Sequence, residues 1–180
     1  KLAEEKVQLQ AANTKIINLE ERLERIEQEG REKNIILMNV PNQEKEDTKD
    51  LVTKIISRIG IPVKTEEFES RRISKKENSP IVIKFKSESA KWNILMKKKE
   101  IGTLKMKDCG FFGENVIYFN EDLSQTKQEL YSRVRKFKKD KNYDFAWIKN
   151  ENIYVKKNES SRPILIKHET VLEALYLPEY

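Results

Sequence analysis

Apolar residues at the start of the chain recur with a heptad period that stops near Gly30. From Leu9 onward the a and d positions of this seam are Leu9, Ala12, Ile16, Leu19, Leu23 and Ile26. A helix with such a stripe buries it against copies of itself or against a partner helix. We therefore predict an oligomerising coiled coil over residues 1–30.

Charged residues beside the seam indicate the number of strands. Arg22 falls at a g position and Glu27 at the following e position. The arginine stem can then cover the seam while its guanidinium reaches a carboxylate of a neighbouring chain. This spacing resembles the Arg-h-x-x-h-Glu motif that is common in three-stranded coiled coils. We expect a homotrimer, and a dimer with an ordinary charged flank is the alternative.

Beyond Gly30 the pattern becomes that of a compact unit, predicted over residues 33–120. Apolar runs predict strands at 34–40, 68–73, 80–86 and 116–120. One helix is predicted from the capping residue Asp47 to Gly60, and another from Ser87 or Ser89 through Met96. The order strand–helix–strand–strand–helix–strand is that of a split βαβ sandwich.

A small α+β domain is predicted over residues 121–180. Asn120 or Asp122 is the expected cap of its first helix. The apolar face of that helix is expected to carry Leu123, Leu130, Val134 and Phe137. Strands are expected at 144–149, 153–157 and 162–167, before a last helix at 169–176. The predicted fold class is thus α+β, with a coiled coil, a βαββαβ sandwich and a helix–strands–helix domain.

The charge balance favours phosphate-bearing partners. The net charge is +6 and the sequence pI about 9.2. Residues 1–33 sum to about −1, residues 34–110 to about +6 and residues 111–180 to about +1. The positive charge therefore belongs mainly to the βαββαβ unit.

Other features of the sequence exclude several classes of protein. Cys109 is the only cysteine, so neither a disulfide framework nor a cysteine zinc site can form within one chain. No apolar run approaches the roughly 18 residues of a membrane helix, so no membrane partner is expected. The chain starts at Lys1 rather than Met, and we expect it to be a piece of a longer protein.

No catalytic motif is visible. His168 is the only histidine and has no cysteine or histidine nearby in the sequence to share a metal. The chain has no P-loop, no nucleophile–His–Asp arrangement and no paired-carboxylate motif. We expect a protein that is not an enzyme, with no metal, no cofactor and no small-molecule substrate.

The first predicted strand, IILMNV, resembles the first-strand motif of RNA-recognition-motif (RRM) domains. Its aromatic, base-stacking slot holds Ile36, and Lys84 and Lys86 project from the third strand where stacking rings are expected. The resemblance implies an RRM-like sandwich without the stacking platform. Such a module would bind nucleic acid through the phosphate backbone.

The order of parts resembles the RNA-binding first-reading-frame protein of LINE-type retrotransposons. The parts are the stalk, KNIILMNVP, a basic turn, SPIVIKF and VIYFNEDLS. The resemblance implies a trimeric stalk, single-stranded RNA or DNA in a basic cleft, RNA coating and nucleic-acid chaperoning without catalysis. It also implies a cytoplasmic ribonucleoprotein, with the nucleus as a further location.

The C-terminal stretch resembles a second family. The segment from NVIYFNEDL to RPILIK is similar to the C-terminal domain of baculovirus few-polyhedra (FP) proteins. This resemblance implies the alternative function, a viral structural or assembly protein that acts mainly through protein–protein contacts.

The candidate contacts with nucleic acid are basic residues and one tyrosine. The match to the basic second-strand segment of the retrotransposon family implies that four residues bind phosphates: Arg71, Arg72, Lys75 and Lys76. The alternative is that this segment is only a solvated polar turn. Tyr118 either stacks a base or packs against a helix. The other candidates are Lys84, Lys86, Arg133, Arg135, Lys139, Lys156 and Arg162. A basic helix such as 133–139 is usually a solvated face, so about two of its cations are expected to touch the ligand.

Overall fold

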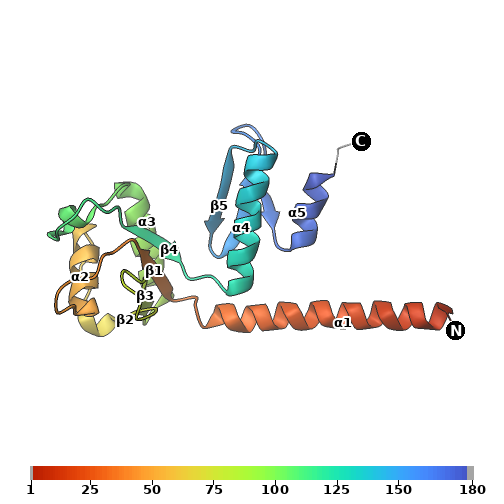
Figure 1. Cartoon of the computed structure of the whole chain (residues 1–180), viewed down its shortest axis with the longest axis horizontal. Helices are drawn as coiled ribbons and strands as arrows, with labels where there is room; N and C mark the ends of the chain where they lie inside the picture. The colour runs from red at the N-terminus through yellow and green to blue at the C-terminus, as the bar shows by residue number, and fades with distance from the viewer. Residues whose placement is uncertain (1, 178–180) are drawn as a thin grey trace. The chain divides into compact units, whose positions relative to one another are not determined.

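The structure, a computed structural model, describes residues 2–177. The chain forms two compact units (Figure 1). One comprises Glu29–Asp122, and the other combines the N-terminal helix with the segment from Leu123 onward. The chain is α+β, as predicted.

The Glu29–Asp122 unit contains a four-stranded antiparallel sheet in the order β2-β3-β1-β4. Its strands are β1 (Asn34–Met38), β2 (Phe68–Arg72), β3 (Ile81–Phe85) and β4 (Tyr118–Glu121). Its helices are α2 (Thr48–Arg58) and α3 (Glu88–Ile101), with the short helical turns η1 (Thr65–Glu67) and η2 (Met106–Cys109). The predicted strand and helix order is confirmed, although the fourth strand starts at Tyr118, two residues later than expected.

One face of this sheet packs on the helices. The core includes alternate strand residues and one stripe of α2: Ile35, Leu37, Ile81, Ile83, Phe85, Leu51, Val52, Ile55 and Ile56. The Asp47 carboxylate caps α2 by accepting from the backbone N–H groups of Lys49 and Asp50, as predicted. Because side chains alternate across a strand, the residues between the buried ones point to the other face.

Neither Asn120, which lies in β4, nor Asp122 caps the helix that follows, so that expectation was wrong. Asp122 has other partners. Its buried carboxylate instead accepts from Arg31 at 3.0 Å and from the Asn34 side-chain amide at 2.8 Å. Ser124 is the N-cap of α4 (Gln125–Asp140), and its hydroxyl accepts from the Lys127 backbone N–H. Leu123 therefore precedes the helix and is not on its apolar face.

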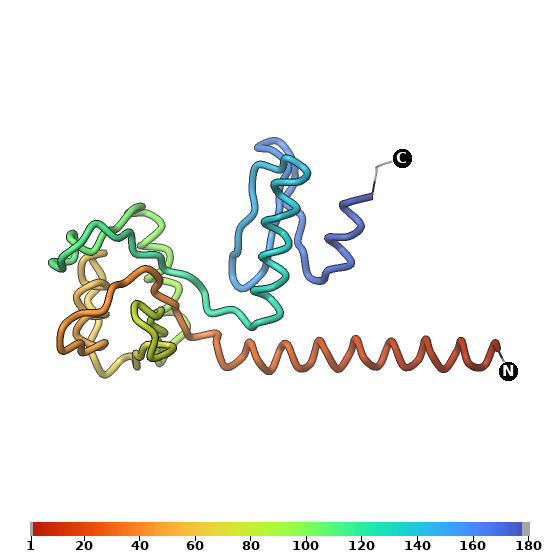
Figure 2. Tube along the Cα trace, viewed as in Figure 1, coloured from red at the N-terminus to blue at the C-terminus, as the bar shows by residue number. Residues whose placement is uncertain are grey.

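The C-terminal part of the second unit places helices on one face of a three-stranded sheet. The strands β5 (Phe145–Lys149), β6 (Asn152–Lys156) and β7 (Ile164–Ile166) pair antiparallel in that order. Val134 and Phe137 of α4 pack with Ile153, Val155 and Leu172, the last from α5 (Glu169–Tyr176). Figure 2 follows the chain through these elements.

The β5–β6 hairpin turns without glycine. Asn150 and Glu151 both have positive φ angles, 49° and 62°. This is the backbone sign that a two-residue type I′ turn requires, and asparagine tolerates it well. The turn fixes which residues of β5 and β6 face each other.

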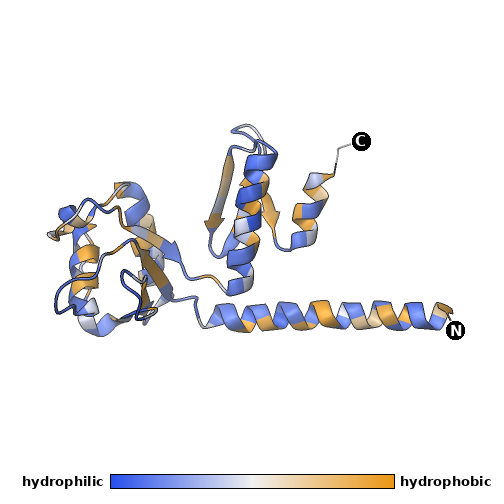
Figure 3. Ribbon diagram, in the orientation of Figure 1, coloured by the Kyte–Doolittle hydropathy of each residue, from blue (hydrophilic) through white to orange (hydrophobic). Residues whose placement is uncertain are grey.

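The N-terminal helix α1 (Leu2–Glu29) has the predicted extent, and its apolar residues alternate with polar ones (Figure 3). Three residues of α1 contact the C-terminal part of its unit: Glu21 pairs with His168, Glu24 accepts from the Ser124 hydroxyl, and Gln28 accepts from the Ser124 backbone N–H. In the predicted heptad these three residues are at f, b and f, opposite the a/d seam. The contacts therefore leave the seam uncovered.

Residues 2–177 contain neither a candidate membrane span nor a candidate metal-binding cluster. No helix there combines the length and the apolar character that crossing a membrane requires. Nor does that part of the chain gather three or more His, Cys, Asp or Glu side chains into a metal-binding group.

Candidate nucleic-acid interface

The face of the four-stranded sheet turned away from the helices carries three predicted ligand contacts. Arg71, Val82, Ile36 and Asn120 pair in register and form one row across all four strands. They alternate with the buried core residues, so they share the outward face. Ile36 therefore occupies the outward position expected from the sequence.

Lys84 and Tyr118 lie on the same face as Arg71. Lys84 is exposed and faces Glu69 of β2, and Tyr118 is 54% exposed and faces Met38 of β1. Arg71 is on one edge strand and Tyr118 on the other, three strand spacings or about 14 Å apart across the sheet. Tyr118 is therefore not packed against a helix, and its stacking on a base stays a prediction.

Lys86 extends this face beyond the end of β3. Its backbone N–H donates to the Glu67 carbonyl, so strand pairing continues to this residue, and its side chain is exposed. Lys84 and Lys86 are two residues apart and so project on the same side. The outward face thus carries Arg71 on the edge strand β2 and Lys84 and Lys86 on β3. Glu69 of β2 is the acidic neighbour of Lys84.

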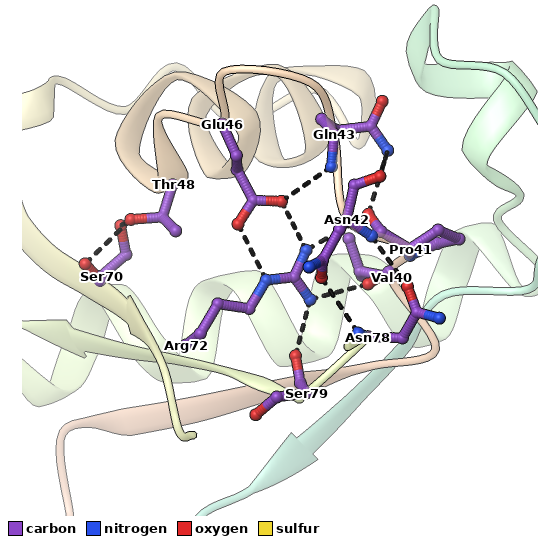
Figure 4. A network of polar contacts seen from close by, with 10 residues as sticks. All are labelled: Val40, Pro41, Asn42, Gln43, Glu46, Thr48, Ser70, Arg72, Asn78 and Ser79. Carbon is purple, nitrogen blue, oxygen red and sulfur yellow. Dashed lines mark hydrogen bonds and ion pairs between the residues drawn. The ribbon is translucent and has the colours of Figure 1, made fainter. Parts of the chain in front are cut away.

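Arg72 points the other way and lies in a polar network (Figure 4). Its guanidinium forms a two-bond pair with Glu46, Nε to Oε1 at 2.8 Å and Nη2 to Oε2 at 2.6 Å. The remaining N–H groups donate to the carbonyls of Val40, Pro41 and Ser79. All five guanidinium donors have acceptors, so Arg72 joins the segment 40–46 to Ser79. No donor is left for a phosphate.

The same network supports the turn that carries Lys75 and Lys76. The Ser79 hydroxyl accepts from the Ser74 backbone N–H at 2.9 Å. Asn42 and Asn78 exchange bonds, each backbone N–H donating to the other's side-chain oxygen, at 2.9 and 3.0 Å. Both lysines remain exposed at the end of this braced turn.

The ionisation of Glu46 reflects this network. The hydrogen bond from Arg72 lowers the pKa of the Glu46 carboxyl, partial burial opposes that shift, and the Gln43 backbone N–H adds to it. The pair therefore stays charged at neutral pH. Glu46, Asn42 and Asn78 carry no sequence signal that marks them as supports of a basic turn, because their partners are distant in the chain.

The predicted cations of α4 have mixed surroundings. Arg133 forms an ion pair with Glu169 of α5, and the Arg135 guanidinium lies 5.3 Å from the centre of the Tyr131 ring. Lys139 is exposed. Because α4 packs on the inner face of the C-terminal sheet, these residues and Lys156 lie on opposite sides of that sheet.

The outward face of the C-terminal sheet carries aromatic residues that the sequence analysis did not single out. Trp147 and Tyr154 pair in register and stack, with ring centres 5.5 Å apart and an interplanar angle of 16°. Phe145 pairs with Lys156, whose ammonium lies 5.7 Å from the ring centre. The alternation within FAWIK and NIYVK is the signal that would have found this face.

The remaining predicted residue, Arg162, is exposed just before β7. The structure thus places the predicted ligand residues in three groups. The first is the outward face and turn of the four-stranded sheet, the second is the solvent side of α4, and the third is the outer face and entry of the C-terminal sheet.

The predicted oligomerisation residues are all exposed in the single chain. Ile16 and Leu19 are each 52% exposed, and Leu9, Leu23, Ile26, Arg22 and Glu27 are exposed as well. A run of exposed large aliphatic side chains on one helix face is typical of a surface that associates.

Comparison with known proteins gives a match for the C-terminal part of the chain. The family model for baculovirus FP protein domain 2 matches residues 124–176, from the N-cap of α4 to the last residue of α5. The predicted similarity of the C-terminal stretch to FP proteins is therefore confirmed for this segment. No curated protein matches the chain.

Proposed function

We propose that this chain is an oligomeric single-stranded RNA- or DNA-binding protein with little sequence preference, which acts as a nucleic-acid chaperone in a ribonucleoprotein of retrotransposon type. The observation that carries the proposal is the outward face of the four-stranded sheet. Arg71 and Lys84 share it with the exposed Tyr118, a combination suited to gripping phosphates and stacking a base. No chemical step is assigned to the protein.

The strand order supports the inference that the Glu29–Asp122 unit is an RRM-like domain. RRM domains bind single strands on the outward face of a four-stranded antiparallel sheet, where aromatic side chains stack bases. Here the central row holds Ile36 and Val82 instead of rings. We therefore assign the outward face mainly to phosphates, so that binding depends on charge more than on base identity.

The exposed seam of α1 supports the oligomeric part of the proposal. We assign α1 to a three-stranded coiled coil, with Arg22 and Glu27 pairing between chains and a dimer as the alternative. Each oligomer then presents several basic modules to one nucleic-acid strand, which strengthens binding without any new contact.

The match to baculovirus FP protein domain 2 favours a second candidate, a structural or assembly protein that acts through protein contacts. The charge would then serve solubility. Because this function does not require phosphate contacts, the two candidates differ in their response to salt.

The test measures the mass of the full chain by light scattering and its affinity for unstructured single-stranded RNA at two salt concentrations. The proposal expects an oligomer whose affinity falls steeply as salt rises, with a slope of about −3 to −4 per module for four to six phosphate contacts. Absent or salt-independent binding would contradict it and favour the assembly protein.

A further inference from the structure

The outward face of the C-terminal sheet is a second surface with a distinct chemistry. Its positions, read from the strand register, are Phe145, Trp147, Lys149, Asn152, Tyr154, Lys156 and Leu165. Three of these seven are aromatic and two are lysines, and none of these outward strand positions is acidic.

The three rings form one aromatic cluster on this face. Trp147 and Tyr154 are nearly parallel and half-buried, and Phe145 beside them is 38% exposed. The hydrophobic core of this domain lies on the other side of the sheet, so these three rings are not needed to fill it. Large aromatic side chains on a solvent-facing sheet are unusual without a partner.

The charges around the rings favour an anionic partner. Lys156 lies over the edge of the aromatic group, 5.7 Å from the Phe145 ring centre, and Lys149 ends β5 on the same face. A single strand offers both flat bases and phosphates, and base–aromatic stacking tolerates any sequence. A protein partner would need acidic groups to match the lysines, whereas a single strand supplies phosphates at every residue.

We propose that Trp147 and Tyr154 form a base-stacking platform for single-stranded nucleic acid, with Lys149 and Lys156 at the phosphates of the stacked nucleotides. This inference rests on the proposed function and deepens it. In this proposal the outward face of the four-stranded sheet supplies mainly phosphate contacts, and the outward face of the C-terminal sheet supplies base contacts.

The test compares two strands of equal length and equal phosphate number, oligothymidylate and a fully abasic strand, against the full chain. We expect the wild type to prefer oligothymidylate by about tenfold or more, since each stacked base contributes substantially. Trp147→Ala should remove most of this preference, and Trp147→Phe, which keeps a ring, should retain much of it. The matched control is Phe112→Ala, because Phe112 is 99% exposed in the other unit and should leave the preference unchanged.

A second readout does not depend on a variant that removes the platform. Trp92→Phe leaves Trp147 as the one tryptophan. Its fluorescence should change when oligothymidylate binds and change far less with the abasic strand. An unchanged Trp147 signal on binding would overturn the platform and leave the proposed function standing. Equal affinity of the wild type for both strands would overturn the platform and the stacking role of Tyr118, and would leave standing the binding through phosphates. Failure of the wild type to bind either strand would overturn both the platform and the proposed function.

Discussion

The guanidinium of Arg72 and the carboxylate of Glu46 form a nearly buried ion pair, with Nη2 and Oε2 2.6 Å apart and both side chains 14% exposed. The adjacent Arg71 lies on the opposite face of the same strand, in the row that faces outward. Strand alternation thus separates two consecutive arginines into different roles. Arg72 joins loops that brace the basic turn, while Arg71 remains available for a ligand.

Glu46→Gln should destabilise the protein by about 2–3 kcal/mol at neutral pH, because it leaves the guanidinium of Arg72 without its countercharge. The lowered pKa of Glu46 means that the folded state favours the carboxylate. Its contribution is therefore complete above the unfolded-state pKa of about 4.3 and is lost as pH falls through the lower folded-state pKa. Urea unfolding from pH 7 to pH 3 should show the difference between wild type and variant shrinking with acid. Glu44→Gln, an exposed neighbour, is the control and should change little.

Arg71→Ala and Arg72→Ala should have different effects. Arg71→Ala should weaken binding to all single strands about equally and reduce the salt slope by about 0.7, the value for one lost phosphate contact. Its unfolding midpoint should stay close to that of the wild type, because Arg71 is exposed. Arg72→Ala should act mainly on stability and lower the unfolding midpoint, because Arg72 holds loops together and has no donor left for a ligand. Salt titrations and urea unfolding of both variants check this, and a loss of stability in Arg71→Ala without any change of slope would remove Arg71 from the interface.

The local pattern of the sequence predicts the strands and helices well. Alternation in PIVIKFK places Ile81, Ile83 and Phe85 in the core and Lys84 outside, and the structure agrees. Arg72 shows the limit of this reasoning, because three of its four acceptor residues, Val40, Pro41 and Glu46, come from 26 to 32 positions earlier in the chain. Lys91 shows it too. A lysine in the first turns of a helix is expected to be solvated, yet it is fully buried and donates to the Glu32 carbonyl.

Charge density along the sequence likewise does not show which cations are already paired within the chain. The run 133–139 is the densest basic segment, but Arg133 is paired with Glu169, a partner that only the packing of α5 on α4 brings near. The Trp147–Tyr154 stack likewise depends on the register of the β5–β6 hairpin. The positive φ angles at Asn150 and Glu151 set that register, and the dipeptide is a weaker turn signal than one containing glycine.

The seam of α1 should set the oligomeric state. Ile16→Glu combined with Leu23→Glu places charges at two a positions and should convert the oligomer to a monomer. The matched control is Ile17→Glu: Ile17 is equally apolar and 54% exposed, but it occupies a b position outside the a/d seam. Light scattering at micromolar concentration should give a monomer for the double variant and the wild-type mass for the control. An equal effect of both would show that general hydrophobicity, and not the heptad, drives association.

The length of the nucleic acid should decide how much the oligomer matters. A short oligonucleotide reaches one module, so the wild type and the monomeric Ile16→Glu/Leu23→Glu variant should bind it with the same affinity per site. A long strand can visit several modules of one oligomer, and the resulting local concentration should strengthen its binding by about 10²–10⁴ over the monomer. Affinities for a length series of single-stranded RNA, measured against both proteins at one salt concentration, check this. If the longest strand bound both equally, multivalent binding would be wrong, and the exposed seam would serve assembly with other proteins instead.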